Sequence, residues 1–305
     1  LVDLSSYPTK EIAHNSHDYR PLGLGYANLG ALLMINGIPY DSDKGRAIAA
    51  ALPAILCGEG YIASAKMAAH KGAFAGYTHN ADSMMNVMKM HREHTYKIDP
   101  TLCDPSLLKA SHEIWDTVVT LGEKYGYRNA QATVLAPTGT IGLLMDCDTT
   151  GVEPDFAIVK WKKLAGGGYF KIVNQSIPRS LRTLGYTQSE INDIIAYALG
   201  AGTLDGAPYL NEDIFKKLEL SDAQLSEARA HVEKVKNFDE FVPHLNSVTL
   251  KKVLNDEQIA DIALYVNGTQ TVEGAPYLRG EHLPVFDCAN TCGIGKRFIA
   301  PMGHV

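Results

Sequence analysis

The residues best suited to chemistry in this sequence lie in the stretch APTGTIG, where Pro137 is followed by Thr138, Gly139 and Thr140. A glycine lets backbone N–H groups come close to a ligand, and threonine hydroxyls can add further hydrogen bonds. Such a loop is suited to holding the oxygen atoms of a phosphate. A proline turn that follows a strand explains the same residues equally well. Spacing alone therefore leaves an anion site and a plain turn as two alternatives.

Other motifs that could bind nucleotides are incomplete. The string GLGYAN at 23–28 begins like a dinucleotide fingerprint, but Asn28 stands where the third glycine is required. We interpret its glycines as positions where a strand packs closely on a helix. The sequence also lacks a Gly-x-Ser-x-Gly elbow and a glycine-rich loop that ends in GK[ST], which argues against a serine hydrolase and a P-loop ATPase.

Two groups of residues invite a metal interpretation. His91 and His94 lie three residues apart in an expected helix, and Cys288 and Cys292 lie between His282 and His304. Neither group has the C-x-x-C or H-E-x-x-H spacing that makes zinc convincing. We therefore expect no metal, and interpret the histidines as a solvated helix face and the cysteines as buried or surface thiols.

The elements around the loop follow from periodicity and capping residues. The short β-prone segment from Ala132 to Ala136 predicts a buried strand that leads into the loop. Helices are expected from the cap Asp41-Ser42-Asp43 to about Ala69, and near 81–94 and 106–125, whereas residues 1–20 are expected to form a loop. A second β-prone stretch follows Glu153-Pro154 and precedes three glycines, Gly166-Gly167-Gly168, and the string YFKIVN.

The second half of the chain contains an internal duplication. Residues 190–210 align without gaps on residues 258–278, and both copies end in GAPYL. The duplication predicts a repeated helix-plus-loop unit, although two copies are too few for a solenoid. We place a domain boundary near Ser176, which gives a first domain of residues 1–175 and a mainly helical region of residues 176–305.

Composition narrows the class of protein. The chain has 305 residues, of which 46% are hydrophobic and 20% charged, and a net charge of -6, as is typical of a soluble globular protein that does not bind nucleic acid through a basic surface. Five scattered cysteines suit reduced thiols. We see no apolar run near the roughly 20 residues of a membrane span and no signal peptide, so we expect no membrane partner and a cytoplasmic location.

Four strings of this sequence closely resemble the adenosylcobalamin-dependent, class II ribonucleotide reductases. These strings are NSHDYRPLGLGYANLGALLMINGIPYDSDKGR, APTGTIGLLMDCDTTGVEPDFA, KKLAGGGYFKIVNQSIPRSLRTLGY and HLPVFDCANTCGIGKRFIAPMGH, and together the likeness covers essentially the full chain. The resemblance implies an α/β fold, in which this chain is the second half of a ten-stranded α/β barrel with a mostly helical insertion.

The resemblance also assigns roles to the loop. It implies that Pro137 shapes the turn, and that Thr138, Gly139, Thr140 and Ile141 present amides and hydroxyls to the diphosphate of a ribonucleotide substrate. It implies adenosylcobalamin as the cofactor, a thioredoxin-like reductant, and a deoxynucleotide or ATP effector at a site outside this chain. Diphosphate and triphosphate substrates stay open, as do monomer and homodimer.

The cysteines that do the chemistry of that family do not match any of the five here. The family uses a thiyl radical on a finger loop and a redox pair, and we expect those strings to lie before Leu1. Cys147 belongs to a matching string, but we interpret it as a packed residue behind the loop. We therefore expect no catalytic residue in this chain and no nucleotide reduction by the chain alone. The alternatives are a non-catalytic assembly or nucleotide-binding subunit that completes a barrel with a partner, and a reductase of another class.

Overall fold

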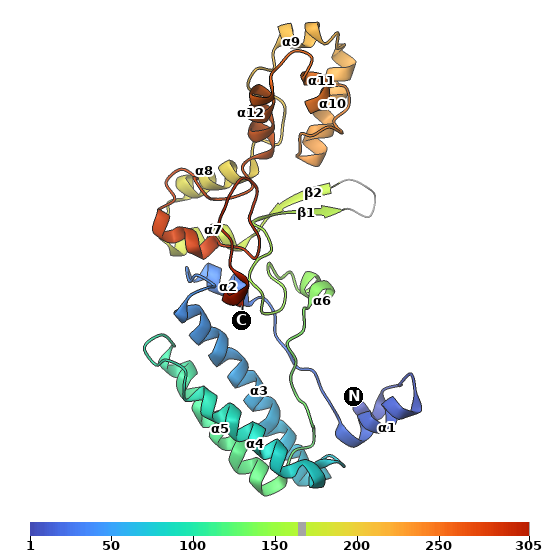
Figure 1. Ribbon diagram of the computed structural model, residues 1–305, viewed down its shortest axis with the longest axis vertical. Coiled ribbons are helices and arrows are strands. Elements are labelled where there is room, and N and C mark those ends of the chain that lie inside the picture. Colours follow the sequence, from blue (N-terminus) through green and yellow to red (C-terminus); the bar gives the residue numbers. More distant parts are fainter. Residues whose placement is uncertain (164–168, 305) are drawn as a thin grey trace. The chain divides into compact units, whose positions relative to one another are not determined.

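The computed structural model describes residues 1–163 and 169–304, and these residues form two compact units (Figure 1). The first unit comprises Leu1–Leu29 and Asp41–Val152, and the second comprises Gly30–Tyr40 and Glu153–Val305. The expected Gly166-Gly167-Gly168 segment lies outside the described residues. The boundary near Ser176 stays a prediction about the domains of the complete protein.

Three long helices form the frame of the first unit. These are α3 (Asp43–Lys71), α4 (Tyr77–Thr95) and α5 (Pro105–Tyr125), and α5 packs against both others. Their shared core includes Tyr61, Trp115 and Tyr127. The predicted cap is confirmed, because the Ser42 hydroxyl accepts a hydrogen bond from the Gly45 N–H at 3.0 Å. The three helices predicted here are therefore all present, with ends within a few residues of those expected.

The expectation that no segment could span a membrane was too strong. Helix α3 has 29 residues and contains an 18-residue stretch of mean hydropathy 1.5, so it is long and apolar enough by composition. About a third of that stretch is buried within the described structure. Core helices of soluble proteins pass the same test, and α3 packs along α5 through small residues such as Ala51 and Ala65.

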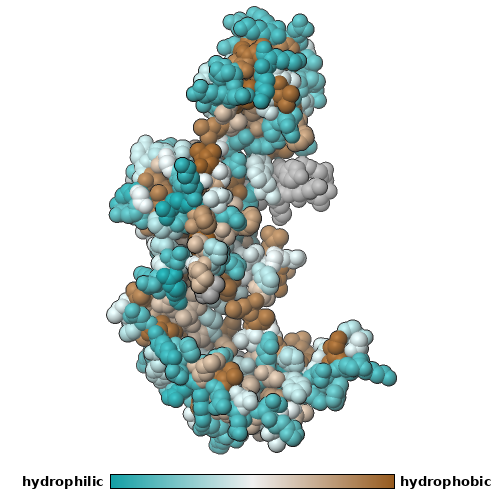
Figure 2. Space-filling model, viewed as in Figure 1, coloured by the Kyte–Doolittle hydropathy of each residue, from teal (hydrophilic) through white to brown (hydrophobic). Residues whose placement is uncertain are grey.

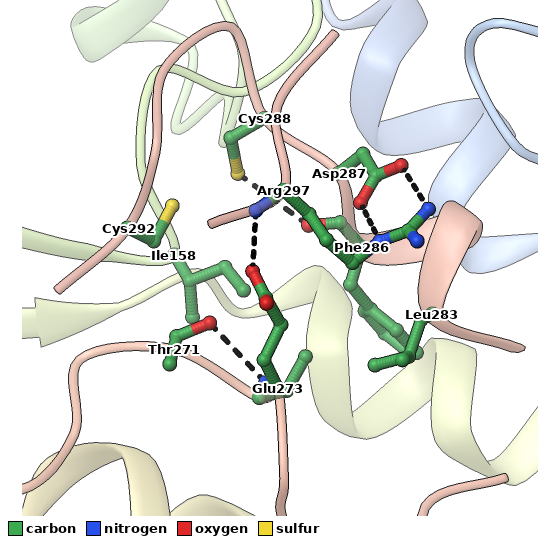
Figure 3. Close-up of a pocket in the computed structure, with 10 residues that line it drawn as sticks. Ile158, Thr271, Glu273, Leu283, Phe286, Asp287, Cys288, Cys292 and Arg297 are labelled. Carbon is green, nitrogen blue, oxygen red and sulfur yellow. Dashed lines mark hydrogen bonds and ion pairs between the residues drawn. The ribbon is translucent and has the colours of Figure 1, made fainter. Parts of the chain in front are cut away.

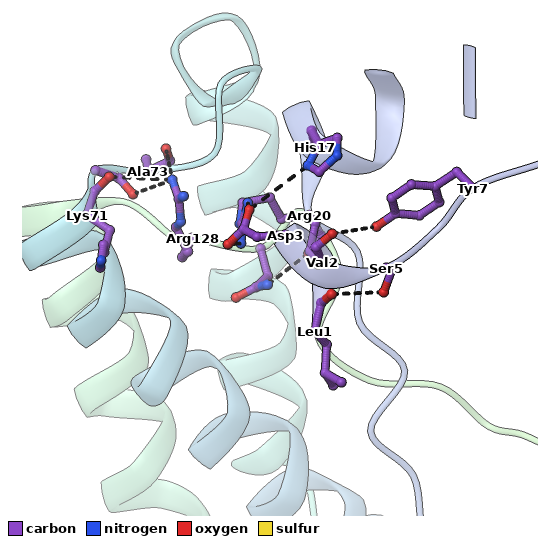
Figure 4. Close-up of polar contacts among 12 residues, drawn as sticks. Leu1, Val2, Asp3, Ser5, Tyr7, His17, Arg20, Lys71, Ala73 and Arg128 are labelled. Carbon is purple, nitrogen blue, oxygen red and sulfur yellow. Dashed lines mark hydrogen bonds and ion pairs between the residues drawn. The ribbon is translucent and has the colours of Figure 1, made fainter. Parts of the chain in front are cut away.

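The first twenty residues are not the loop that we expected. They contain η1 (Val2–Leu4) and α1 (Lys10–Tyr19), and Thr9 caps α1 by accepting a hydrogen bond from the Ile12 N–H. The guanidinium of Arg20 binds both carboxylate oxygens of Asp3, at 2.8 and 2.9 Å, and so ties the end of α1 back to η1 (Figure 4). Periodicity missed α1 because it is polar, with no buried residue.

Arg128 caps the C-terminal end of α3. Its Nη1 donates to the carbonyls of Lys71, Gly72 and Ala73 at 3.3–3.5 Å (Figure 4). A cation at this end of a helix is favourable, because the last carbonyls lack partners and carry partial negative charge. The strand expected from Ala132 to Ala136 is reduced to one parallel bridge between Leu24 and Thr133.

The second unit is built around an antiparallel hairpin. Its strands are β1 (Val159–Lys163) and β2 (Tyr169–Val173), with Val159 opposite Val173. The helices of this unit are short, and their bounds are α2 (Leu29–Ile35), α7 (Ser176–Thr183), α8 (Gln188–Leu199), α9 (Glu212–Lys217), α10 (Asp222–Val235), α11 (Ser247–Leu250), α12 (Asp256–Asn267), η2 (Gly280–Phe286) and α13 (Pro301–His304). The first residue of α2, Leu29, is assigned to the first unit.

The duplicated segments form two equivalent units that exchange their ends. Helices α8 and α12 are the two copies of the helix, and each packs against the tail of the other copy. Ile191 and Ile194 of α8 lie in one core with Val272 and Ala275, while Ile259 and Ile262 of α12 lie in another with Leu204 and Ala207. The tyrosine hydroxyls repeat this exchange, because Tyr197 donates to the Glu273 carbonyl at 3.0 Å and Tyr265 to the Asp205 carbonyl at 2.8 Å.

The two copies meet where α8 and α12 end. Gly200 and Gly268 have φ of 71° and 67°, and a Cβ added to either would lie 2.2–2.3 Å from the backbone nitrogen of the other. The ammonium of Lys171, on β2, donates to the last carbonyls of both helices, Leu199 O at 2.6 Å and Asn267 O. Lys171 therefore caps both copies at once from the hairpin.

Candidate functional site

The predicted phosphate loop leads directly into α6 (Gly139–Leu144) in the first unit. Pro137 and Gly139 are exposed, Thr138 is half-buried, and Thr140 and Ile141 are exposed. Gly139, Thr140 and Ile141 thus form the first turn of a short helix, Thr138 is its N-cap, and Pro137 precedes the cap. In the first turn of a helix the N–H groups have no intrahelical acceptor, and none of the described residues accepts from the amides of Gly139, Thr140 and Ile141.

Thr138 has an unusual backbone conformation. Its φ of 52° and ψ of 36° lie in the left-handed region, which a β-branched residue rarely adopts. Such a conformation costs on the order of 1–3 kcal/mol and persists only where surrounding contacts fix it. The contact that fixes it is short: the Gly151 N–H donates to the Thr138 hydroxyl at 2.6 Å. Since that oxygen already accepts, its own hydrogen is free to point outward toward an anion.

The returning segment 149–151 packs closely behind the loop. A Cβ on Gly151 would lie 2.7 Å from the Ala136 carbonyl, so only glycine allows this approach. The Thr149 N–H and hydroxyl both donate to the side-chain oxygen of Asn28, at 3.0 and 3.4 Å. Asn28 is thus a positioning residue that sequence reasoning missed. Its place in an interrupted glycine motif was the available signal.

The glycines of GLGYAN do not pack a strand on a helix, as we had expected. Their segment runs beside the residues that precede the loop, since Leu22 N donates to Gln131 O and Leu24 N to Ala132 O, at 2.8 and 2.9 Å. A Cβ on Gly25 would lie 2.8 Å from the Val134 carbonyl. The glycines therefore allow two extended segments to approach each other, and this pairing positions the chain that enters the loop.

Cys147 lies behind α6. It is half-buried, its N–H donates to the Gly142 carbonyl at 2.9 Å, and its Cβ lies 3.9 Å from where a Cβ on Gly142 would be. Gly142 is buried, whereas the exposed amides belong to residues 139–141. The thiol is therefore placed for packing beneath the helix rather than for contact with a ligand at its start.

An apolar surface surrounds the loop. Leu135, Ile141, Leu143, Leu144 and Met145 are all exposed, and the region of α6 shows brown surface in Figure 2. Exposed positions of a solvated helix are usually polar, but α6 exposes Leu143 and Leu144 instead. An exposed apolar face of this kind is typical of an interaction surface.

The histidines considered as metal ligands have other partners. The His91 ring lies edge-on to Trp115, with ring centroids 5.3 Å apart, and burial lowers its pKa. His94 Nδ1 contacts the Met90 carbonyl at 2.9 Å, and His282 Nδ1 contacts the Tyr186 hydroxyl at 2.8 Å. Within residues 1–163 and 169–304, no three His, Cys, Asp or Glu side chains gather as a metal site would require.

Comparison with known proteins shows the family of this chain. Residues 1–265 match the family model described as the barrel domain of ribonucleotide reductase, and the chain belongs to this family. A vitamin B12-dependent ribonucleotide reductase from Agrobacterium fabrum is 46% identical over 344 residues, covering 100% of this chain and 27% of the relative.

Two further relatives carry the same description. The protein from Bradyrhizobium diazoefficiens is 44% identical over 346 residues, which is all of this chain and 27% of the relative. The protein from Rhodopirellula baltica is 53% identical over 214 residues, which is 70% of this chain and 20% of the relative. The chain thus spans about a quarter of the length of these relatives.

Proposed function

We propose that this chain supplies the substrate phosphate-binding loop of a vitamin B12-dependent ribonucleotide reductase, an enzyme that converts ribonucleotides to deoxyribonucleotides. The observation that carries the proposal is the start of α6, where the amides of Gly139, Thr140 and Ile141 are open beside the strained Thr138. Membership of the reductase family supports the nature of the ligand.

The chemistry of the loop suits a diphosphate. Phosphate oxygens carry several negative charges and need converging donors, which backbone N–H groups at a helix start provide together with a favourable partial charge. The Thr138 hydrogen and the Thr140 hydroxyl add two further donors. Pro137 fixes the turn that directs the chain into α6. Each of these groups binds and orients the substrate, and none of them exchanges a proton or electron with it.

The exposed apolar face of α6 supports the view that the loop works inside a larger body. In the complete protein this chain would form the second half of a ten-stranded barrel, whose other half covers Leu143, Leu144 and Met145. The finger loop with its radical cysteine, the redox cysteines and the effector site would then lie in parts of the protein outside this chain.

Adenosylcobalamin, when bound, would supply a carbon-centred radical by homolysis of its cobalt–carbon bond. That radical needs a thiol beside the substrate, and Cys147 does not fit this role because it packs against Gly142 behind the helix. Cys147 is therefore not placed to serve as that thiol, and we derive no step through the cofactor. We expect the isolated 305-residue chain not to reduce nucleotides, and turnover by that chain would contradict the proposal.

The proposal is tested in the complete enzyme by replacing Thr138 and Thr140 together with valine. The Michaelis constant for the ribonucleotide should rise by a factor that corresponds to about 1–3 kcal/mol, because hydrogen bonds to a charged group are lost. Thr150→Val is the matched control, since Thr150 is an exposed threonine of the returning segment 149–151, outside the first turn of α6. Equal kinetics for the double variant and the control would remove the loop from the substrate site.

A further inference from the structure

Two thiols in the second unit lie in one small cavity, far along the sequence from the phosphate loop (Figure 3). Cys288 and Cys292 are separated by three residues on the segment after η2. That segment is held at both cysteines, because the Ile299 N–H donates to the Cys288 carbonyl and the Gly295 N–H to the Cys292 carbonyl, each at 2.8 Å. The backbone therefore fixes the two residues relative to each other.

The two thiols line the same cavity and are largely buried, with exposed fractions of 1% and 6%. Each sulfur donates to the backbone carbonyl two residues before it, Cys288 to Phe286 O and Cys292 to Asn290 O, at 3.6 Å. The neighbouring Cys288 thiol lowers the pKa of Cys292, whereas Cys292 and burial raise the pKa of Cys288. Cys288 thus holds the proton while Cys292 is the more readily ionised sulfur. A thiolate beside a thiol is the arrangement from which disulfides form.

A small cavity lies beside both thiols. It has a volume of about 10 Å³, enough for one molecule of the size of water, and both cysteines line it. Its wall also carries the Thr271 hydroxyl and the ion pair of Arg297 with Asp287, at 2.7 Å, which are visible in Figure 3. Polar groups of this kind favour a small polar molecule over an apolar one.

We propose that Cys288 and Cys292 form a reversible disulfide within the chain, with Cys292 as the attacking sulfur and a small peroxide as the oxidant. In the first step the Cys292 thiolate attacks one peroxide oxygen. The sulfur–oxygen bond forms, the oxygen–oxygen bond breaks, and the released hydroxide takes up a proton to become water. In the second step the Cys288 sulfur attacks the resulting sulfenic acid, the disulfide bond forms, and a second water leaves.

The other three cysteines lack this arrangement. Cys57, Cys103 and Cys147 belong to the first unit, and none of them contacts another thiol among the described residues. Burial raises the pKa of both Cys57 and Cys103. Cys147 is half-buried and more accessible than either proposed partner. It therefore serves as an internal reference for oxidation that depends on exposure alone.

The sequence allows a direct measurement. Trypsin cleaves after Arg279 and Lys296, and the peptide between these sites holds Cys288 and Cys292 and no other cysteine. The folded chain is treated with increasing hydrogen peroxide, unfolded in an alkylating reagent, digested and analysed by mass spectrometry. We expect this peptide to carry no alkyl group and to have the mass of its dithiol form less two hydrogen atoms. This should occur at peroxide concentrations that leave Cys103 fully alkylated. Dithiothreitol should restore the doubly alkylated peptide.

Single variants assign the roles of the two sulfurs. In Cys288→Ser the sulfenic acid of Cys292 should persist and react with dimedone, whereas in Cys292→Ser the remaining Cys288 should stay alkylatable. The proposal is overturned if the wild-type peptide keeps both thiols at peroxide concentrations that oxidise Cys147, or if the disulfide forms only after the chain has been unfolded. The wild-type measurement needs no variant, so it decides the question even if a variant does not fold.

Discussion

Lys171 connects the hairpin to both copies of the duplicated segment through one side chain. It is buried, with an exposed fraction of 8%, and its ammonium lies 5.5 Å from the centre of the Trp161 ring. Its bonds to the ends of α8 and α12 place a positive charge at the negative ends of two helices. Burial acts in the opposite direction and lowers its pKa to about 8. The residue is therefore both a cap and a source of pH dependence.

Lys171→Met should destabilise the second unit by about 1–3 kcal/mol near pH 7, because two buried carbonyls lose their donor. Between about pH 8 and the pKa of unfolded lysine, near 10.4, the unfolded chain holds a proton that the folded chain has released. Wild-type stability should therefore rise over this window through Lys171, and the variant should lack that rise. Urea unfolding at a series of pH values measures both effects, and parallel pH profiles would contradict the assignment.

Asn28 offers a second test at the level of one side chain. Its φ of 74° suits glycine, so Asn28→Gly keeps the backbone and removes only the hydrogen bonds to Thr149. The lost bonds should cost about 0.5–1.5 kcal/mol. Amides of residues 149–151 should then exchange with solvent up to about tenfold faster. Unchanged exchange there would mean that other contacts hold the returning segment.

At the scale of elements, the two copies cross closely at Gly200 and Gly268, where a Cβ on either residue would lie 2.2–2.3 Å from the backbone nitrogen of the other. Gly200 is also the C-cap of α8, with ψ of 179°, and Gly72 has a similar conformation at the end of α3, with φ of 79° and ψ of 157°. The two glycines differ in their surroundings. A Cβ on Gly72 meets nothing within 4 Å, whereas one on Gly200 would strike the backbone of the other copy.

Gly200→Ala should therefore destabilise its surroundings by more than Gly72→Ala does. Both variants bear the cost of a backbone region that is almost exclusive to glycine, about 1–3 kcal/mol, but only the first also forces the two backbones apart. Hydrogen exchange in α12 for the first variant, and in α3 for the second, reports the local free energy of opening. Equal effects would show that the crossing tolerates a methyl group.

The elements that the sequence predicted are those whose determinants are local. Helices α3 and α5 have apolar periodicity and side-chain caps at Ser42 and Asp104, so their positions follow from short-range rules. The strand before the loop was not realised, because a strand depends on partners elsewhere in the chain, and the described residues supply only Leu22–Leu24. The left-handed backbone conformation of Thr138 could not be predicted either. Threonine disfavours that conformation, and it is fixed here by the amide of Gly151, which is distant in the sequence.

The exchange of the repeat ends was also beyond prediction. The alignment of the copies shows which residues are equivalent, for example Tyr197 and Tyr265, but it does not say whether each helix packs on its own tail or on the other. That choice depends on the backbone crossing at Gly200 and Gly268. The assignment of residues 137–141 to phosphate binding came from resemblance and stays a prediction, whereas Asn28, which holds the returning segment behind that loop, was not predicted.

At the scale of the whole molecule, the segment 201–267 is a closed unit that contains the tail of the first copy and the helix of the second. Its core residues all lie between Leu204 and Val266. Its two ends are joined by hydrogen bonds from Ala201 N to Tyr265 O at 2.8 Å and from Gly202 N to Val266 O at 3.0 Å. A segment with its own core and adjoining ends has the features of an autonomous folding unit.

A fragment of residues 201–267 should therefore fold alone, with helical circular dichroism and a cooperative thermal transition. Its small size makes the expected stability only a few kcal/mol. A fragment of residues 201–254 is the control, because it lacks α12 and with it Ile259, Ile262 and Val266 of the core. A longer fragment that melts without a cooperative transition would show that the hairpin is needed for folding.

The exchange of ends between the copies has a consequence for ancestry. In a chain with a single copy, the helix would lack the tail that covers it here, and the tail would lack the helix against which it packs here. Two such chains could satisfy both by pairing symmetrically, with each tail lying on the helix of its neighbour. Duplication within one gene turns that association into an intramolecular one, in which the partner is always present at high effective concentration. In this chain the two copies are arranged as the two chains of such a symmetric pair would be.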